Sequence, residues 1–141
     1  MNPATPLTEH NALVAYAAML NRADPSVLAP LLAEGFRLTS QKVLDDLVGK
    51  AAFLEYMAGK FDTLREAGML PRADLARLPG YGHDEAVLIW QGDALDPLVT
   101  VYADVADGQL TALHLCAIPA PATGMPLGLW PGRDGARTAG A

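Results

Sequence analysis

The stretch that decides the fold is residues 13–57, which read LVAYAAMLNRADPSVLAPLLAEGFRLTSQKVLDDLVGKAAFLEYM. It begins with apolar residues spaced at i, i+3, i+4 and i+7, namely Leu13, Tyr16, Ala17 and Leu20. This spacing places them on one face of a helix, for which Thr8 is the expected N-cap. The pair Asp24-Pro25 then predicts the end of this helix and the start of a second, because aspartate caps helices and proline fits their first position.

The rest of the stretch predicts a short second helix, a pair of strands and a third helix. The second helix is expected to end at Gly35, and residues 36–40 then alternate as in a strand. Residues 43–48 are the expected partner of that strand. Gly49 opens the third helix, and Gly68 is its expected C-terminal cap.

From residue 72 onward the hydrophobic period changes from helical to two, which indicates strands. The predicted strands are residues 72–78, 85–91, 98–105 and 110–118. Asp107-Gly108 marks a tight hairpin turn between the last two. Because helices precede hairpin-linked strands, we expect an α+β fold with an antiparallel sheet.

The predicted strands are apolar on both faces, as shown by Val87 and Ile89 on one side of residues 85–91 and Leu88 and Trp90 on the other. One face can cover the helices, but a solvated antiparallel face would be polar. We therefore expect a homodimer that buries the second face of the sheet. The alternative is a sheet so curved that both faces lie in one core.

Composition narrows the function classes. The 141 residues suffice for one domain with a hydrophobic core. A formal net charge of -6 and the lack of a Lys/Arg cluster argue against nucleic acid as a partner, because phosphate binding needs a basic face. The apolar runs are far too short to span a membrane.

Two further features indicate a cytoplasmic protein. The single cysteine, Cys116, cannot form an internal disulfide, which favours a reducing compartment. The first residues, MNPATPLTEHN, lack the basic and apolar regions of a signal peptide.

We expect the domain to span residues 7–118, preceded by an arm of residues 1–6. Residues 119–141 form a Pro/Gly-rich C-terminal tail without a hydrophobic period, which is expected to be irregular. Leu127, Leu129 and Trp130 are the side chains that could pin part of this tail to the surface.

Three segments carry a resemblance to a known family: YAAMLNRADPSVLAPLL at residues 16–32, GKAAFLEYM at 49–57 and DEAVLIW at 84–90. In order and spacing, residues 7–118 resemble the nuclear-transport-factor-2-like (NTF2-like) superfamily, whose cystatin-like cone occurs in ketosteroid isomerases, polyketide cyclases and many proteins of unknown function. The resemblance implies three N-terminal helices packed in the concave face of a strongly curved, mostly antiparallel sheet, which makes a cone-shaped α+β barrel. It also implies a pocket at the open end of the cone and dimerisation through the outer face of the sheet.

Comparison with ketosteroid isomerases implies that this protein does not catalyse their reaction. Tyr16 falls where those enzymes place an oxyanion-donating tyrosine, but their general-base aspartate falls on Ser40. Their second oxyanion donor falls near Thr100. Since the reaction needs a carboxylate to shuttle a proton, Ser40 cannot replace the base without help.

The residues expected to line the pocket are Tyr16, Ser40, Phe53, Met57, Trp90, Thr100 and Tyr102. Tyr16 is either a hydrogen-bond donor at the pocket floor or a core tyrosine whose hydroxyl is satisfied locally. The apolar members are either pocket walls or ordinary core residues, which the sequence does not separate.

The catalytic candidates are Tyr16, Asp45, Asp46 and His114. Asp45 and Asp46 are consecutive strand residues that point to opposite faces, so a solvated hairpin is favoured over a shared acid–base site. His114 lies between Leu113 and Leu115, which are expected to face inward. Strand alternation then turns His114 toward the outer face and favours a structural role over that of a general base.

The sequence offers no recognisable site for a metal or a cofactor. His10, His83, His114 and Cys116 lack the paired spacing of metal ligands, and a zinc site needs three or four of them. No glycine cluster joins a strand to a helix as in a phosphate-binding loop.

Three functions remain open at this point. The leading hypothesis is a small cytoplasmic protein that binds a small hydrophobic molecule in an apolar pocket. The alternatives are a cofactor-independent isomerase, cyclase or dehydratase that uses Tyr16 as donor, and a dimeric interaction module with a filled core. A carboxylate or imidazole near the Tyr16 hydroxyl would favour the enzyme, a cavity with only hydroxyls would favour binding, and a solid core would favour the interaction module.

Overall fold

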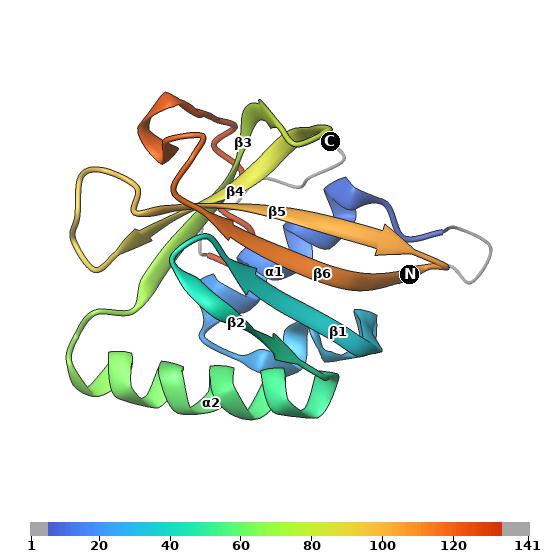
Figure 1. The fold of residues 1–141 in the computed structure, drawn as a ribbon. Coiled ribbons are helices and arrows are strands. Elements are labelled where there is room, and N and C mark those ends of the chain that lie inside the picture. The colour runs from blue at the N-terminus through green and yellow to red at the C-terminus, as the bar shows by residue number, and fades with distance from the viewer. Residues whose placement is uncertain (1–5, 134–141) are drawn as a thin grey trace.

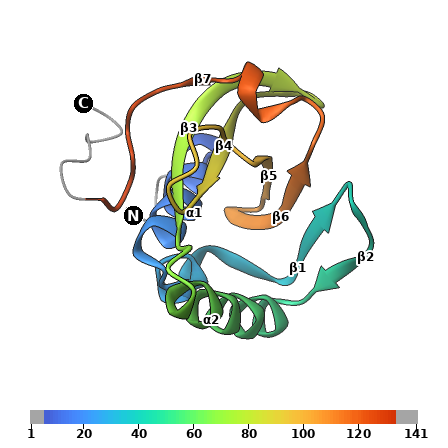
Figure 2. The same cartoon turned by 90° about the vertical axis from the view of Figure 1, so that its left-hand side faces the viewer.

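In the computed structural model, which describes residues 6–133, the chain forms an α+β fold whose helices lie in the concave face of a curved sheet (Figures 1 and 2). The helices are α1 (Glu9–Arg22) and α2 (Lys50–Glu66). The strands are β1 (Leu32–Ser40), β2 (Val43–Val48), β3 (Pro71–Gly80), β4 (His83–Gln91), β5 (Val99–Ala106), β6 (Gln109–Cys116) and β7 (Met125–Pro126). The expected fold class is confirmed.

The sheet has the order β2-β1-β6-β5-β4-β3-β7. β1 and β6 run parallel, and all other neighbours are antiparallel. Figure 2 shows the sheet bending around α1, while α2 lies across the opening next to β1. Among residues 6–133, no helix is both long enough and apolar enough to cross a membrane.

The helix ends follow the local sequence. The Thr8 hydroxyl accepts the N–H of Asn11 at 3.1 Å and caps α1, as predicted. Gly49 precedes α2, and Gly68 has a φ of 68° just beyond its end, a left-handed conformation that glycine adopts without strain.

The predicted second helix is instead two 3-10 turns, Pro25–Val27 and Ala29–Leu31. Asp24 caps the first turn as expected, since its carboxylate accepts the N–H of Ser26 at 3.0 Å. The prediction of a continuous helix is wrong because Pro30 lacks an N–H and its ring clashes with the preceding turn.

A β-bulge at Thr111 sets which residues of β6 face the core. Val105 pairs with Leu110, but Asp104 pairs with Ala112, so Thr111 is an extra residue in β6. The Thr111 hydroxyl donates to the carbonyl of Asp104 at 3.1 Å. Because the extra residue shifts the alternation by one, Leu110 and Leu113 both point into the core.

The tail packs against the sheet as far as residue 133, and it is less irregular than expected. It forms a 3-10 turn at Pro121–Thr123 and the short strand β7, which pairs with β3. Trp130 packs on Trp90, with ring centroids 5.2 Å apart. The tail thus covers part of the outer face for which the sequence suggested a second subunit.

Two polar side chains hold the tail and strand β3 in place. The buried Asp74 carboxylate accepts the N–H groups of Gly128, Leu129 and Trp130 at 2.7, 2.9 and 3.0 Å. The Asn21 amide of α1 donates to the carbonyl of Ala73 at 2.8 Å and accepts its N–H at 2.7 Å. Residues 1–5 of the predicted arm and the end of the tail lie outside the described residues.

Candidate functional site

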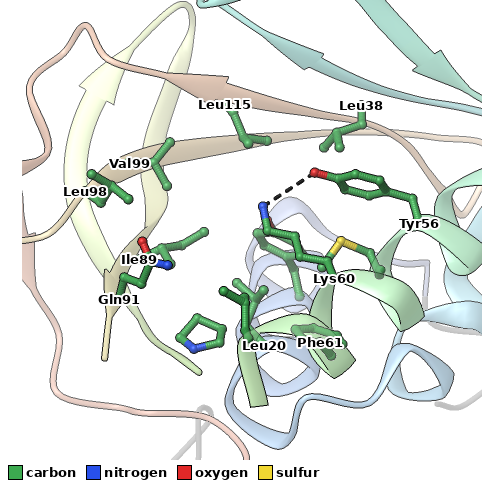
Figure 3. Close-up of a pocket in the computed structure, with 14 residues that line it drawn as sticks. Leu20, Leu38, Tyr56, Lys60, Phe61, Ile89, Gln91, Leu98, Val99 and Leu115 are labelled. Atoms are coloured by element: carbon green, nitrogen blue, oxygen red, sulfur yellow. Dashed lines mark hydrogen bonds between the residues drawn. The ribbon is translucent and has the colours of Figure 1, made fainter. Parts of the chain in front are cut away.

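A cavity of about 130 Å³ lies between the two helices and the concave face of the sheet (Figure 3). Its lining is mostly aliphatic and aromatic and comes from both helices and from strands β1, β3, β4, β5 and β6. The lining residues are Tyr16, Leu20, Leu38, Tyr56, Met57, Lys60, Phe61, Leu64, Pro71, Ile89, Gln91, Leu98, Val99 and Leu115. Side-chain nitrogen and oxygen atoms come from Tyr16, Tyr56, Lys60 and Gln91.

Tyr16 of α1 supplies a buried hydroxyl to this cavity. Its side chain is only 3% exposed, and within residues 6–133 its oxygen has no hydrogen-bond partner. In this part of the chain, every fully buried side-chain nitrogen or oxygen has a hydrogen-bond partner. The Tyr16 hydroxyl has none, so it is not fully buried and borders the cavity that it lines. Burial, and then the nearby Tyr56, raise the pKa of Tyr16 well above its ordinary value, which keeps the group a neutral donor.

Tyr56 and Lys60 reach over the cavity from α2, as Figure 3 shows. The Lys60 ammonium donates to the Tyr56 hydroxyl at 3.5 Å and lies 5.6 Å from the centroid of its ring. Among the described residues, no carboxylate lies within 4.0 Å of this ammonium.

Tyr16 and Met57 lie where the sequence placed them, in the wall of the cavity. Phe53 is fully buried behind the wall, where its ring meets the ring of Phe36 edge-on with centroids 4.7 Å apart. Ser40 lies at the β1–β2 hairpin, where its hydroxyl accepts the N–H of Lys42 at 3.2 Å. Neither Phe53 nor Ser40 lines the cavity.

Trp90, Thr100 and Tyr102 face the opposite side of the sheet, so the expectation that they line the interior pocket is wrong. Trp90 and Tyr102 belong to the outer apolar cluster, and Thr100 pairs with Cys116 of that cluster. A regular ladder from the Asp107-Gly108 turn would place Tyr102 opposite the inward-facing Leu113. The bulge instead pairs Tyr102 with His114.

The candidate bases also lie away from the cavity. Asp45 and Asp46 are exposed on the edge strand β2, and Asp46 accepts a hydrogen bond from Arg37 at 3.3 Å. His114 is on the outer face, as strand alternation predicted. No Asp, Glu or His side chain is among the residues that line the cavity.

Lys60, Tyr56, Gln91 and the strand residues of the wall were missing from the predicted pocket. Tyr56, Lys60 and Leu64 recur every four residues along α2, so they form one row on the helix surface. This spacing predicts that Tyr56 and Lys60 face the same neighbour, which is the cavity. In β4 and β5 the alternation is regular but both faces are apolar, so it does not say which face points inward. In β6 the bulge also shifts the alternation.

A second polar cluster lies on the outer face of the sheet. The two oxygens of Asp104 meet His114 Nε2 at 2.6 Å and His83 Nε2 at 3.3 Å. His114 Nδ1 lies 2.7 Å from the hydroxyl of Thr39, and His83 Nδ1 lies 2.9 Å from Glu9. Within residues 6–133, no group of three or more His, Cys, Asp and Glu side chains is arranged to hold a metal ion.

The sequence matches no protein-family model and no curated protein. Solved structures do match. One is an NTF2-like protein of unknown function from Cytophaga hutchinsonii, with 15% identity over 82% of this chain and 96% of that chain and a TM-score of 0.55. Another is a putative ketosteroid isomerase from Kribbella flavida, with 24% identity over 79% and 80% of the two chains and a TM-score of 0.54.

A third match is a hypothetical protein with a ketosteroid isomerase-like fold from Catenulispora acidiphila, solved in complex with trimethylamine. It shares 13% identity over 82% of this chain and 91% of that chain, with a TM-score of 0.53. At such identities the likeness concerns the fold. The protein therefore has the NTF2-like fold that its sequence resembles.

Proposed function

We propose that the protein binds a small, mainly hydrophobic molecule in the cavity between α1, α2 and the sheet. The observation that carries the proposal is the hydroxyl of Tyr16, which has no protein partner among residues 6–133 and borders a mainly apolar cavity. Because this hydroxyl borders the cavity, it has a proton to donate to whatever occupies that space. A ligand that brings one acceptor and an apolar body would accept from Tyr16 and cover the apolar walls.

The size of the cavity indicates the size of the ligand. Its volume of about 130 Å³ is close to that of apolar cavities of about 150 Å³ that bind benzene. We therefore expect a ligand with one ring or an equivalent short aliphatic body. The trimethylamine complex of the Catenulispora protein supports the idea that this fold can hold small molecules.

An isomerase, cyclase or dehydratase that uses Tyr16 as donor is the second candidate. In its favour, Tyr16 is a buried neutral donor that faces the cavity. Against it, the lining contains no carboxylate or imidazole that could move a proton. The interaction module with a filled core is disfavoured by the cavity itself.

We keep homodimerisation as part of the proposal, because the tail leaves the outer face of β1, β6 and β5 open around His114. Light scattering after size exclusion should give the mass of two chains, and the mass of one chain would contradict this part. We also place the protein in the cytoplasm, because Cys116 is a free thiol.

The binding proposal is tested by thermal shift with toluene and cyclohexanone, two ring compounds of similar size. Both should raise the melting temperature, because each binds only the folded state. Tyr16→Phe removes the donor but keeps the ring, so affinity for cyclohexanone should fall about tenfold while toluene is unaffected. Tyr81→Phe, on the outer face, is the matched control. The proposal fails if neither compound shifts the wild-type melting temperature.

A further inference from the structure

Hydrogen-bond donors collect on the helical side of the cavity. Tyr16 comes from α1, and Tyr56 and Lys60 come from α2. All three side chains line the same cavity. The opposite walls are apolar apart from the amide of Gln91.

Lys60 brings a positive charge to the mouth of the cavity that no acidic side chain of the described residues balances at close range. Its protein hydrogen bond goes to the neutral hydroxyl of Tyr56. That hydroxyl accepts from Lys60 and keeps its own proton to donate. An ammonium and a hydroxyl side by side at the rim of an apolar space form a site for an anionic acceptor.

We infer that the ligand of this cavity is a small hydrophobic carboxylate, with its apolar body against the aliphatic walls and its two oxygens shared among the donors of Tyr16, Tyr56 and Lys60. This inference rests on the proposed function and adds the chemistry of the head group. Two adjacent donors match the two oxygens of a carboxylate. A phosphate would call for more donors, such as arginines or helix N-terminal N–H groups, and Lys60 lies in the middle of α2.

The same charge excludes cationic ligands. An amine protonated at neutral pH would place its charge beside the Lys60 ammonium, with no carboxylate in the lining to compensate. This pocket should therefore reject amines such as the trimethylamine present in the Catenulispora complex.

The test uses three probes that share one ring and differ in charge: benzoate, benzyl alcohol and benzylamine. Their dissociation constants are measured by calorimetry on the full chain at pH 7. Benzoate should bind about tenfold more tightly than benzyl alcohol, as expected for a hydrogen bond to a charged group, and benzylamine should bind most weakly. Lys60→Met keeps the apolar stem and removes the charge, so it should abolish the preference for benzoate.

Lys42→Met, on the exposed β1–β2 turn, is the matched control and should bind all three probes as the wild type does. If benzyl alcohol binds as tightly as benzoate, or if Lys60→Met keeps the preference, the inference is overturned while the proposed function stands. If none of the three probes binds, and toluene and cyclohexanone also fail, both are overturned. Because Lys60 is exposed, its substitution should leave folding intact.

Discussion

Asp74 Oδ1 accepts the backbone N–H of Trp130 at 3.0 Å, which joins a buried carboxylate of β3 to a tail residue 56 positions later in the chain. Two more N–H groups, from Gly128 and Leu129, converge on the same carboxylate. These contacts fix the backbone that leads to Trp130, whose ring packs on Trp90. One aspartate therefore anchors the part of the tail that covers Trp90, beside the pairing of β7 with β3.

Replacing Asp74 should release the tail. Asp74→Ala leaves three N–H groups without their acceptor, so we expect a loss of about 3 kcal/mol in the free energy of unfolding. Urea denaturation measures the loss, and limited proteolysis should show faster cleavage within residues 119–133. Asp84→Ala, at an exposed position of β4, is the control. Unchanged proteolysis in Asp74→Ala would contradict the anchoring role.

Gly59→Ala should stabilise the protein. Gly59 lies inside α2, and a Cβ added there meets no atom within 4 Å. Alanine is better than glycine in a helix by about 1 kcal/mol, so the midpoint of urea unfolding should rise by a corresponding amount.

Gly80→Ala is the contrasting variant. A Cβ at this position would lie 2.6 Å from the hydroxyl of Tyr102, which donates to the carbonyl of Leu78. We expect destabilisation by about 1–3 kcal/mol, because the side chain must move and lose its bond. If Gly59→Ala and Gly80→Ala changed the free energy of unfolding equally, the space around each added Cβ would not determine the effect.

The bulge at Thr111 can be tested by deletion. Without Thr111, β5 and β6 would form an unbroken ladder with the same partners, so Leu110 and Leu113 would still face the core and His114 the outer face. We therefore expect the deletion variant to keep cooperative unfolding in circular dichroism. Thr111→Ala keeps the bulge and loses one hydrogen bond, so it should cost only about 1 kcal/mol. Loss of cooperative unfolding in the deletion variant would show that the bulge itself is needed for the fold.

Cys116 should be a slow nucleophile. Burial raises the pKa of its thiol above the ordinary value, so the reactive thiolate is scarcer at pH 8.5 than in the unfolded chain. Iodoacetamide labelling followed by mass spectrometry should be slower for the native protein than in urea. Since the folded pKa is the higher one, the thiol's contribution to stability is complete below the ordinary thiol pKa and is lost as pH rises through the folded value. Equal labelling rates in both states would contradict the burial.

The sequence was sufficient for the fold because hydrophobic period and caps act locally. Thr8 predicts a helix start and Asp24 predicts a turn. The alternation of Val87 with Leu88 predicts a strand. None of these signals depends on which element packs against it. The continuous second helix failed at Pro30, whose effect on the backbone outweighs the apolar spacing around it.

The site was harder to predict because it depends on register between strands. The extra residue at Thr111 reverses the alternation in β6, and nothing in the alternation of the neighbouring strands announces it. Lys60 is hard to predict for another reason. A charged residue on a helix is usually solvated, and only the packing of α2 across the cone makes it the rim of a cavity.

Asn21 and β7 determine which edge of the sheet is open to another copy of the protein. Together they occupy backbone groups of β3 that would otherwise stand open at one border of the sheet. Strand addition by another chain is thereby directed to β2, the opposite border. There Asp45 and Asp46 project exposed negative charge, and like charges on two approaching strands repel. The two carboxylates that the sequence offered as catalytic candidates therefore oppose strand addition at this border of the sheet.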